Sequence, residues 1–125
     1  MIYKNEQHEV RYRKAVLRKG KTHSRRFLAA VYLLTSQKEL WDRARYAVSN
    51  EKIEFNEISR SNIRLPALLI LLAARDLYEG RKHIHLTDIG DQYLITDWEF
   101  MLIIEAAMIS REGYGWIRKT DERTR

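Results

Sequence analysis

Residues 27–34 read Phe-Leu-Ala-Ala-Val-Tyr-Leu-Leu, an unbroken apolar and aromatic run that decides the fold. A helix of this composition is apolar on every side, and such a helix is stable only where other elements surround it. Residues 65–74 form a second run of this kind, in which Pro66 suits the first turn of a helix. We therefore expect a central apolar helix wrapped by others, with an interface between two copies of the chain as the alternative explanation.

Helix-capping residues divide the remaining sequence into further helices. Asn5 is a preferred N-cap, and Ser36-Gln37-Lys38-Glu39 and Thr96-Asp97-Trp98-Glu99 both have the capping-box pattern. The predicted helices span residues 5–19, 24–35, 37–48, 66–78, 87–93 and 97–111, with a short extended piece at 53–55. The sequence thus predicts an all-α fold, a compact single-domain bundle of about five or six helices.

Composition limits the domain organisation and the cellular context. A chain of 125 residues with 45% hydrophobic content has material for one core, so we expect a single helical domain over residues 1–113. Residues 114–125 are basic and aromatic and are predicted to form a flexible C-terminal tail. The absence of cysteine and of a signal-peptide pattern favours a cytoplasmic protein, and no apolar stretch has the roughly 20 residues that span a bilayer.

Positive charge is concentrated at the start of the chain. Residues 1–26 contain nine Lys or Arg against two Glu, whereas the net charge of the whole chain is +6. Such an imbalance indicates an anionic partner, either nucleic acid or an acidic protein surface, and mere solubility is the alternative. The candidate binding residues on the first helix and the following turn are Arg11, Lys14, Arg18, Lys19, Lys21, Arg25 and Arg26.

The predicted tail offers a second set of candidate contacts. Trp116, Arg118 and Lys119 combine an aromatic ring with two cations. Aromatic rings stack on unpaired bases and cations neutralise phosphates, so these residues are candidate contacts for a single strand. A disordered terminus without a ligand is the alternative.

Catalytic and metal-binding patterns are weak. His83-Ile84-His85, with Asp88 or Asp91 nearby, could hold a metal only if a third or fourth ligand converged on it. None of the five glycines falls in a phosphate-binding loop pattern, and no nucleophile stands beside an evident base. We therefore expect a protein that is not an enzyme and that uses no cofactor and no metal.

The sequence resembles an uncharacterised family of small helical proteins from Firmicutes and their mobile elements. The matching stretches are residues 5–8 (Asn-Glu-Gln-His), 30–35 (Ala-Val-Tyr-Leu-Leu-Thr), 39–41 (Glu-Leu-Trp) and 72–78 (Leu-Ala-Ala-Arg-Asp-Leu-Tyr). The resemblance implies a shared helical fold and no particular activity. The basic segment 11–26 lies outside the matching stretches.

Two functions follow as expectations. In the first, the basic first helix and turn bind nucleic acid through its phosphates. In the second, the chain is a small regulator or inhibitor encoded by a phage or mobile element, for example an antagonist of host defence or of CRISPR. That function would use an apolar anchor such as Trp41 or Trp98 to dock on a larger protein.

Overall fold

The computed structural model describes residues 1–17 and 22–124, with side chains to residue 120, and confirms the all-α fold. Its α-helices are α1 (Glu6–Val16), α2 (Arg25–Leu34), α3 (Lys38–Ala44), α4 (Leu65–Glu79), α5 (Leu86–Ile89), α6 (Asp97–Glu112) and α7 (Tyr114–Thr124). Two 3₁₀ turns, η1 (Arg45–Ala47) and η2 (Phe55–Glu57), flank a two-stranded antiparallel hairpin, β1 (Val48–Ser49) and β2 (Lys52–Ile53). The described part of the chain thus has one helix more than the upper number predicted.

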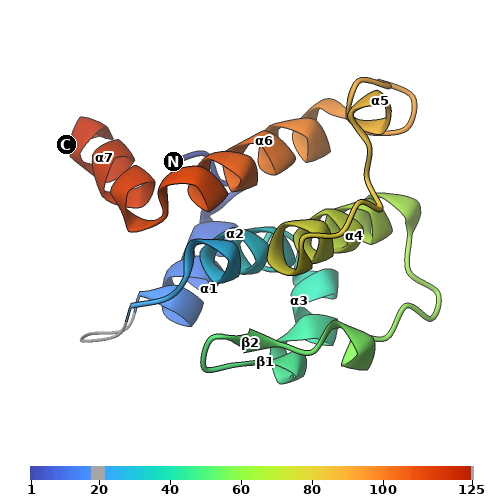
Figure 1. The fold of residues 1–125 in the computed structure, drawn as a ribbon, viewed down its shortest axis with the longest axis horizontal. Coiled ribbons are helices and arrows are strands. Elements are labelled where there is room, and N and C mark those ends of the chain that lie inside the picture. Colours follow the sequence, from blue (N-terminus) through green and yellow to red (C-terminus); the bar gives the residue numbers. More distant parts are fainter. Residues whose placement is uncertain (18–21, 125) are drawn as a thin grey trace.

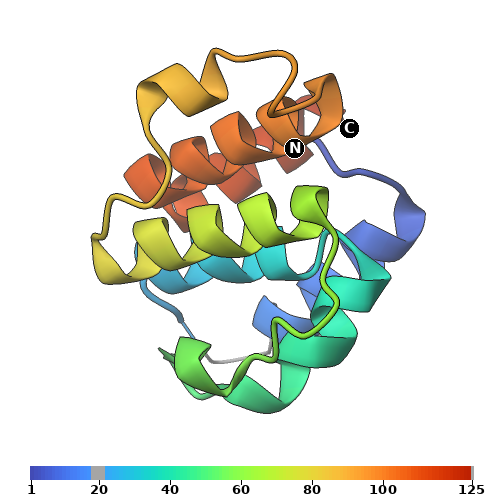
Figure 2. The same ribbon diagram turned by 90° about the vertical axis from the view of Figure 1, so that its right-hand side faces the viewer.

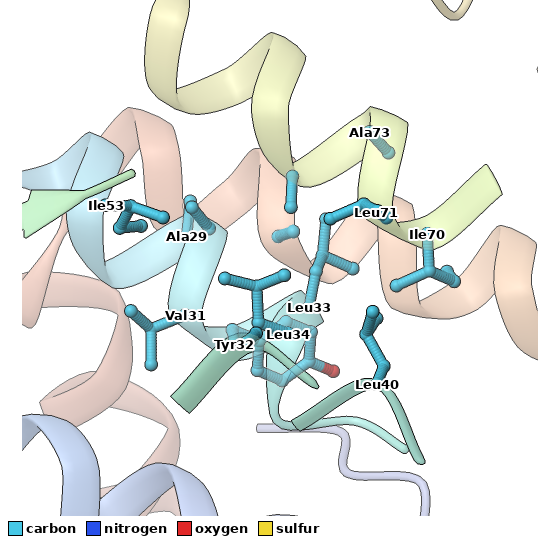
Figure 3. Close-up of a cluster of buried hydrophobic side chains, with 14 of the residues drawn as sticks. Ala29, Val31, Tyr32, Leu33, Leu34, Leu40, Ile53, Ile70, Leu71 and Ala73 are labelled. Carbon is cyan, nitrogen blue, oxygen red and sulfur yellow. The ribbon is translucent and has the colours of Figure 1, made fainter. Parts of the chain in front are cut away.

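Helix α2 is the centre of the molecule. All eight residues from Phe27 to Leu34 are buried, and α2 packs most extensively against α4 and α6. Figures 1 and 2 show α6 on one side of α2, α1 and α3 on the other, and α4 alongside. The cluster in Figure 3 joins Leu33 and Leu34 of α2 to Ile70 and Leu71 of α4. The expected central apolar helix is confirmed, and neighbours within the chain suffice to bury it.

Most helix ends lie where the capping residues predict them. The side chain of Asn5 accepts a hydrogen bond from His8 N at 2.8 Å, and Ser24 Oγ accepts one from Phe27 N at 3.2 Å. Gly80 ends α4 in the left-handed conformation, with φ of 73°. The capping box predicted at Ser36 is wrong, because Ser36 Oγ donates to Leu33 O at 2.6 Å and α3 begins two residues later.

The C-terminal segment differs from the flexible tail that the sequence predicts. Residues 114–124 form α7, which packs against α6 and buries Ile117 in the core. The indole Nε1 of Trp116 donates to Glu105 Oε1 at 2.5 Å, which fixes α7 to α6. Sequence reasoning missed this helix because only one of its residues is fully apolar and buried, so that its pattern resembles a frayed end.

Gly113 joins α6 to α7 in a conformation that few other residues adopt. Its φ is 59° and its ψ −139°, and a Cβ built there would lie 2.7 Å from Arg25 Cγ. We expect Gly113→Ala to lower the free energy of unfolding by about 1–3 kcal/mol. Gly115→Ala is the matched control: it lies inside α7 with nothing within 4 Å, and should raise stability by about 0.5–1 kcal/mol. Urea denaturation measures both, and equal stabilities would contradict this account of the turn.

Within residues 1–17 and 22–124, none of the helices combines the length and apolar content that a bilayer crossing requires.

Candidate functional site

A groove of about 600 Å³ runs between α1 and the segment formed by α3, η1 and the start of the hairpin. These elements lie together on the side of α2 opposite α6 (Figure 1). Its walls are formed by Val10, Arg11, Lys14, Ala15, His23, Phe27, Lys38, Trp41, Asp42, Arg45, Val48, Ser49 and Asn50. A volume of this size is typical of sites for small ligands or short segments of a polymer.

The groove is strongly cationic. Four of its side chains are Lys or Arg and one is a carboxylate. Arg11 is partly buried, and its Nε donates to Thr35 O at 2.8 Å at the C-terminal end of α2. That bond anchors the guanidinium at the groove wall, where burial lowers its pKa without removing its charge. Lys14, one turn along α1, is exposed, as is Arg45 on the opposite wall.

Asp42 is the single carboxylate in the wall. Lys38 Nζ lies 2.8 Å from Asp42 Oδ2, and this hydrogen bond lowers the pKa of Asp42; Arg45 and Arg11 lower it further. Asp42 therefore stays ionised at neutral pH and holds Lys38 along α3. The ion pair leaves Arg11, Lys14 and Arg45 as a surplus of positive charge.

Trp41 supplies the aromatic surface of the groove. It is half-buried on α3, where part of the ring packs on the core and part lines the groove. The sequence marked Trp41 as an anchor for a protein partner. Its place among cations is also the arrangement that single-strand-binding proteins use to stack bases.

His23 closes one end of the groove. Its Nδ1 lies 2.7 Å from Glu51 Oε1, and its ring stacks on Phe27 with centroids 4.7 Å apart. The side chain is only 6% exposed, and Nε2 is buried with no hydrogen-bond partner among the residues that the structure describes. The sequence offered no partner for His23, because Glu51 is 28 residues away and the hairpin brings the two together.

The residues predicted to bind an anionic partner do not form one patch. Arg11 and Lys14 line the groove. Arg25 turns toward α6, where its Nη1 donates to Arg111 O at 3.0 Å, and Arg26 lies beside Gly80 at the end of α4. The remaining predicted residues, Arg18, Lys19 and Lys21, lie outside the described residues.

The predicted tail contacts lie on α7, apart from the groove wall. Trp116 is partly buried and its ring nitrogen is bonded to Glu105, so its polar edge is engaged within the protein. Arg118 and Lys119 are exposed on the same helix. The structure therefore does not bring Trp116, Arg118 and Lys119 together with the groove.

The histidine pair of residues 83 and 85 divides between two local contacts. His83 Nδ1 lies 2.6 Å from Asp76 Oδ1 on α4, while His85 N donates to Asp88 Oδ2 at 2.9 Å at the start of α5. Among the residues with described positions, no group of three or more His, Cys, Asp or Glu is placed to hold a metal ion.

Sequence reasoning missed the second wall of the groove. Lys38, Asp42 and Arg45 follow one another at spacings of four and three residues, which places them on one helical stripe. That spacing is the signal that could have identified the stripe. Its position opposite Arg11 and Lys14 depends on how α3 packs, which no local pattern reveals.

Comparison of the chain with protein-family models, with curated proteins and with solved structures gives no match in any of the three.

Proposed function

We propose that this protein binds nucleic acid in the groove between α1 and α3. The observation that carries the proposal is the meeting of Arg11, Lys14 and Arg45 around Trp41 in one concave site. Cations that converge from two walls neutralise neighbouring phosphates, and an aromatic ring between them gives a base a stacking surface. A protein that only needed solubility would gain nothing from gathering these side chains in a hollow.

The shape of the groove favours a single strand over a duplex. A site of about 600 Å³ admits one or two nucleotides of a flexible strand, whereas a rigid duplex offers its phosphates on a convex surface. Bases are free to stack on Trp41 only where they are unpaired. The function supported best is therefore the binding of single-stranded nucleic acid without strong sequence preference.

Fluorescence anisotropy with a fluorescein-labelled hexathymidylate tests this function. Three or four phosphate contacts predict that log K falls with log[salt] with a slope of about −2 to −3, since each contact on a single strand contributes about −0.7. The double variant Lys14→Ala/Arg45→Ala should bind more weakly, and its slope should be smaller in magnitude by about 1.4. Both residues are exposed, so the fold should be unaffected.

A matched control removes the same charge elsewhere. Arg60 and Lys82 are exposed cations that do not line the groove, and Arg60→Ala/Lys82→Ala lowers the net charge equally. This control should keep the wild-type slope. Equal losses in the two double variants would show that net charge, and not the groove, accounts for binding.

A second candidate function, docking on a larger protein, is favoured by one observation. Helix α6 carries an exposed apolar face, on which Phe100 is 42%, Met101 40% and Ile104 44% exposed. Apolar faces of this kind on a helix often mark protein contacts. A protein that the chain captures from bacterial lysate after nuclease treatment, and that Ile104→Glu fails to capture, would support this function; capture that depends on nucleic acid would oppose it.

A further inference from the structure

His23 is a polar group whose bonding is half complete. One ring nitrogen, Nδ1, is bonded to Glu51, while the other, Nε2, is buried without a hydrogen-bond partner among the described residues. A buried polar atom left in this state costs about 1–3 kcal/mol. Because the ring forms part of the groove wall, a ligand in the groove is placed to supply the missing partner.

Glu51 is held in a strained conformation that serves this histidine. Its φ is 64°, in the left-handed region that glycine or asparagine normally fills at a hairpin turn. The carboxylate also accepts from Ser24 N, at 3.1 Å and 3.2 Å, so it fixes both the ring and the backbone that leads into α2. Such strain is characteristic of functional sites, where a side chain is needed in spite of its backbone cost.

The charges around His23 favour an anion at the open nitrogen. The ionisable groups that face it are Glu51 from the hairpin turn, Arg11 and Lys14 from α1, Arg45 from η1 and Tyr114 from α7, whereas α2 contributes only Phe27. Burial raises the pKa of Tyr114, which is therefore neutral at physiological pH. The three groove cations oppose a proton on the ring of the empty site, and an incoming anion offsets them.

We infer that His23 binds a phosphate group of the nucleic-acid strand, donating from Nε2–H to a phosphate oxygen while Glu51 holds Nδ1–H. This inference rests on the proposed function and specifies which atom of the groove meets the phosphate. The carboxylate and the phosphate stand on opposite sides of the ring and together stabilise the imidazolium. Strand binding and protonation of His23 are consequently linked: each favours the other.

Affinity for hexathymidylate, measured by anisotropy between pH 6 and pH 8 at constant salt, tests this linkage. The wild-type protein should bind more tightly at pH 6 by up to about tenfold, which corresponds to one unit of pKa change on binding. His23→Gln keeps a hydrogen-bond donor but cannot titrate, so its affinity should be independent of pH. Glu51→Gln keeps an acceptor for Nδ1 but removes the negative charge, and should weaken binding at pH 6.

The other histidines serve as controls. His83→Gln changes an exposed histidine outside the groove wall and should keep the wild-type pH profile. Histidine-ring ¹⁵N spectra of the unmutated protein give a second readout, in which hexathymidylate should shift His23 Nε2 and leave His83 and His85 unchanged.

Two results have different meanings. Binding that depends on Lys14 and Arg45, with an unaltered pH profile in His23→Gln and an unmoved His23 ring signal, would overturn this inference and leave the proposed function standing. Failure of hexathymidylate to bind at any pH would overturn both.

Discussion

Leu33→Ala is expected to lower the free energy of unfolding by about 2–5 kcal/mol. Leu33 is fully buried in α2, within the cluster that joins α2 to α4 (Figure 3). Alanine in its place loses the transfer energy of the removed carbons and leaves a cavity that rigid neighbouring helices fill only in part. Because the stability of a domain is typically about 5–15 kcal/mol, this one substitution removes a large share of it.

Leu86→Ala is the matched control for this substitution. Leu86 opens α5 and is 86% exposed, so the same chemical change there should alter stability by no more than about 0.5 kcal/mol. Urea denaturation followed by circular dichroism measures both variants, and the melting temperature of Leu33→Ala should fall by about 10 °C. Similar stabilities of the two variants would show that α2 is not the centre of the core.

Acidification is the second change for which we expect a large effect, through His8. This residue is fully buried between the N-terminal segment and α2. Its Nδ1 accepts from Lys4 N at 3.0 Å and its Nε2 donates to Tyr32 O at 2.8 Å, so both bonds require the neutral ring with its proton on Nε2. Burial lowers the pKa of His8 from 6.5 to about 4; the bond to Tyr32 O opposes this shift, and Arg11 and Lys4 add to it.

The depressed pKa of His8 makes the folded state less stable in acid. Above pH 6.5 the ring is neutral in both states, so stability does not depend on its titration. Between pH 6.5 and pH 4 the unfolded chain binds a proton at His8 that the folded protein does not, and stability falls as pH falls. The loss attributable to His8 is about 2 kcal/mol at pH 5 and about 3 kcal/mol at pH 4.

His8→Gln isolates this contribution, because glutamine does not titrate. Urea denaturation at pH 7, 6 and 5 should show a fall in stability for the wild-type protein that exceeds the fall for His8→Gln by about 2 kcal/mol at pH 5. His85→Gln, which removes an exposed histidine, should follow the wild-type profile. Parallel profiles for wild type and His8→Gln would contradict a neutral, buried His8.

The core of the fold was predictable because its signal is local. Residues 27–34 are too apolar to lie at a surface, and Asn5, Ser24 and Gly80 mark helix ends through backbone geometry that any fold would impose. The capping box at Ser36 failed because its hydroxyl had a nearer acceptor in the last turn of α2. Helix α7 was missed because its stability comes from Ile117 and Trp116 contacting α6, a tertiary effect.

The candidate site was predictable only in part. The basic stripe of α1 placed Arg11 and Lys14 at the protein surface, and both line the groove. Arg25 and Arg26 belong to the same charged segment, yet they follow the turn into α2 and point toward α6 and α4. The contact between His23 and Glu51 depends on where the hairpin lies against the start of α2, which charge patterns in the sequence do not contain.

Amide chemical-shift mapping with hexathymidylate tests the groove most directly. The account predicts that the signals of Lys14, Trp41 and Arg45 shift together and saturate at one concentration, while those of Phe100 and Ile104 on α6 stay in place. Shifts concentrated on α6, or spread evenly over the cationic surface with no preference for the groove, would contradict it.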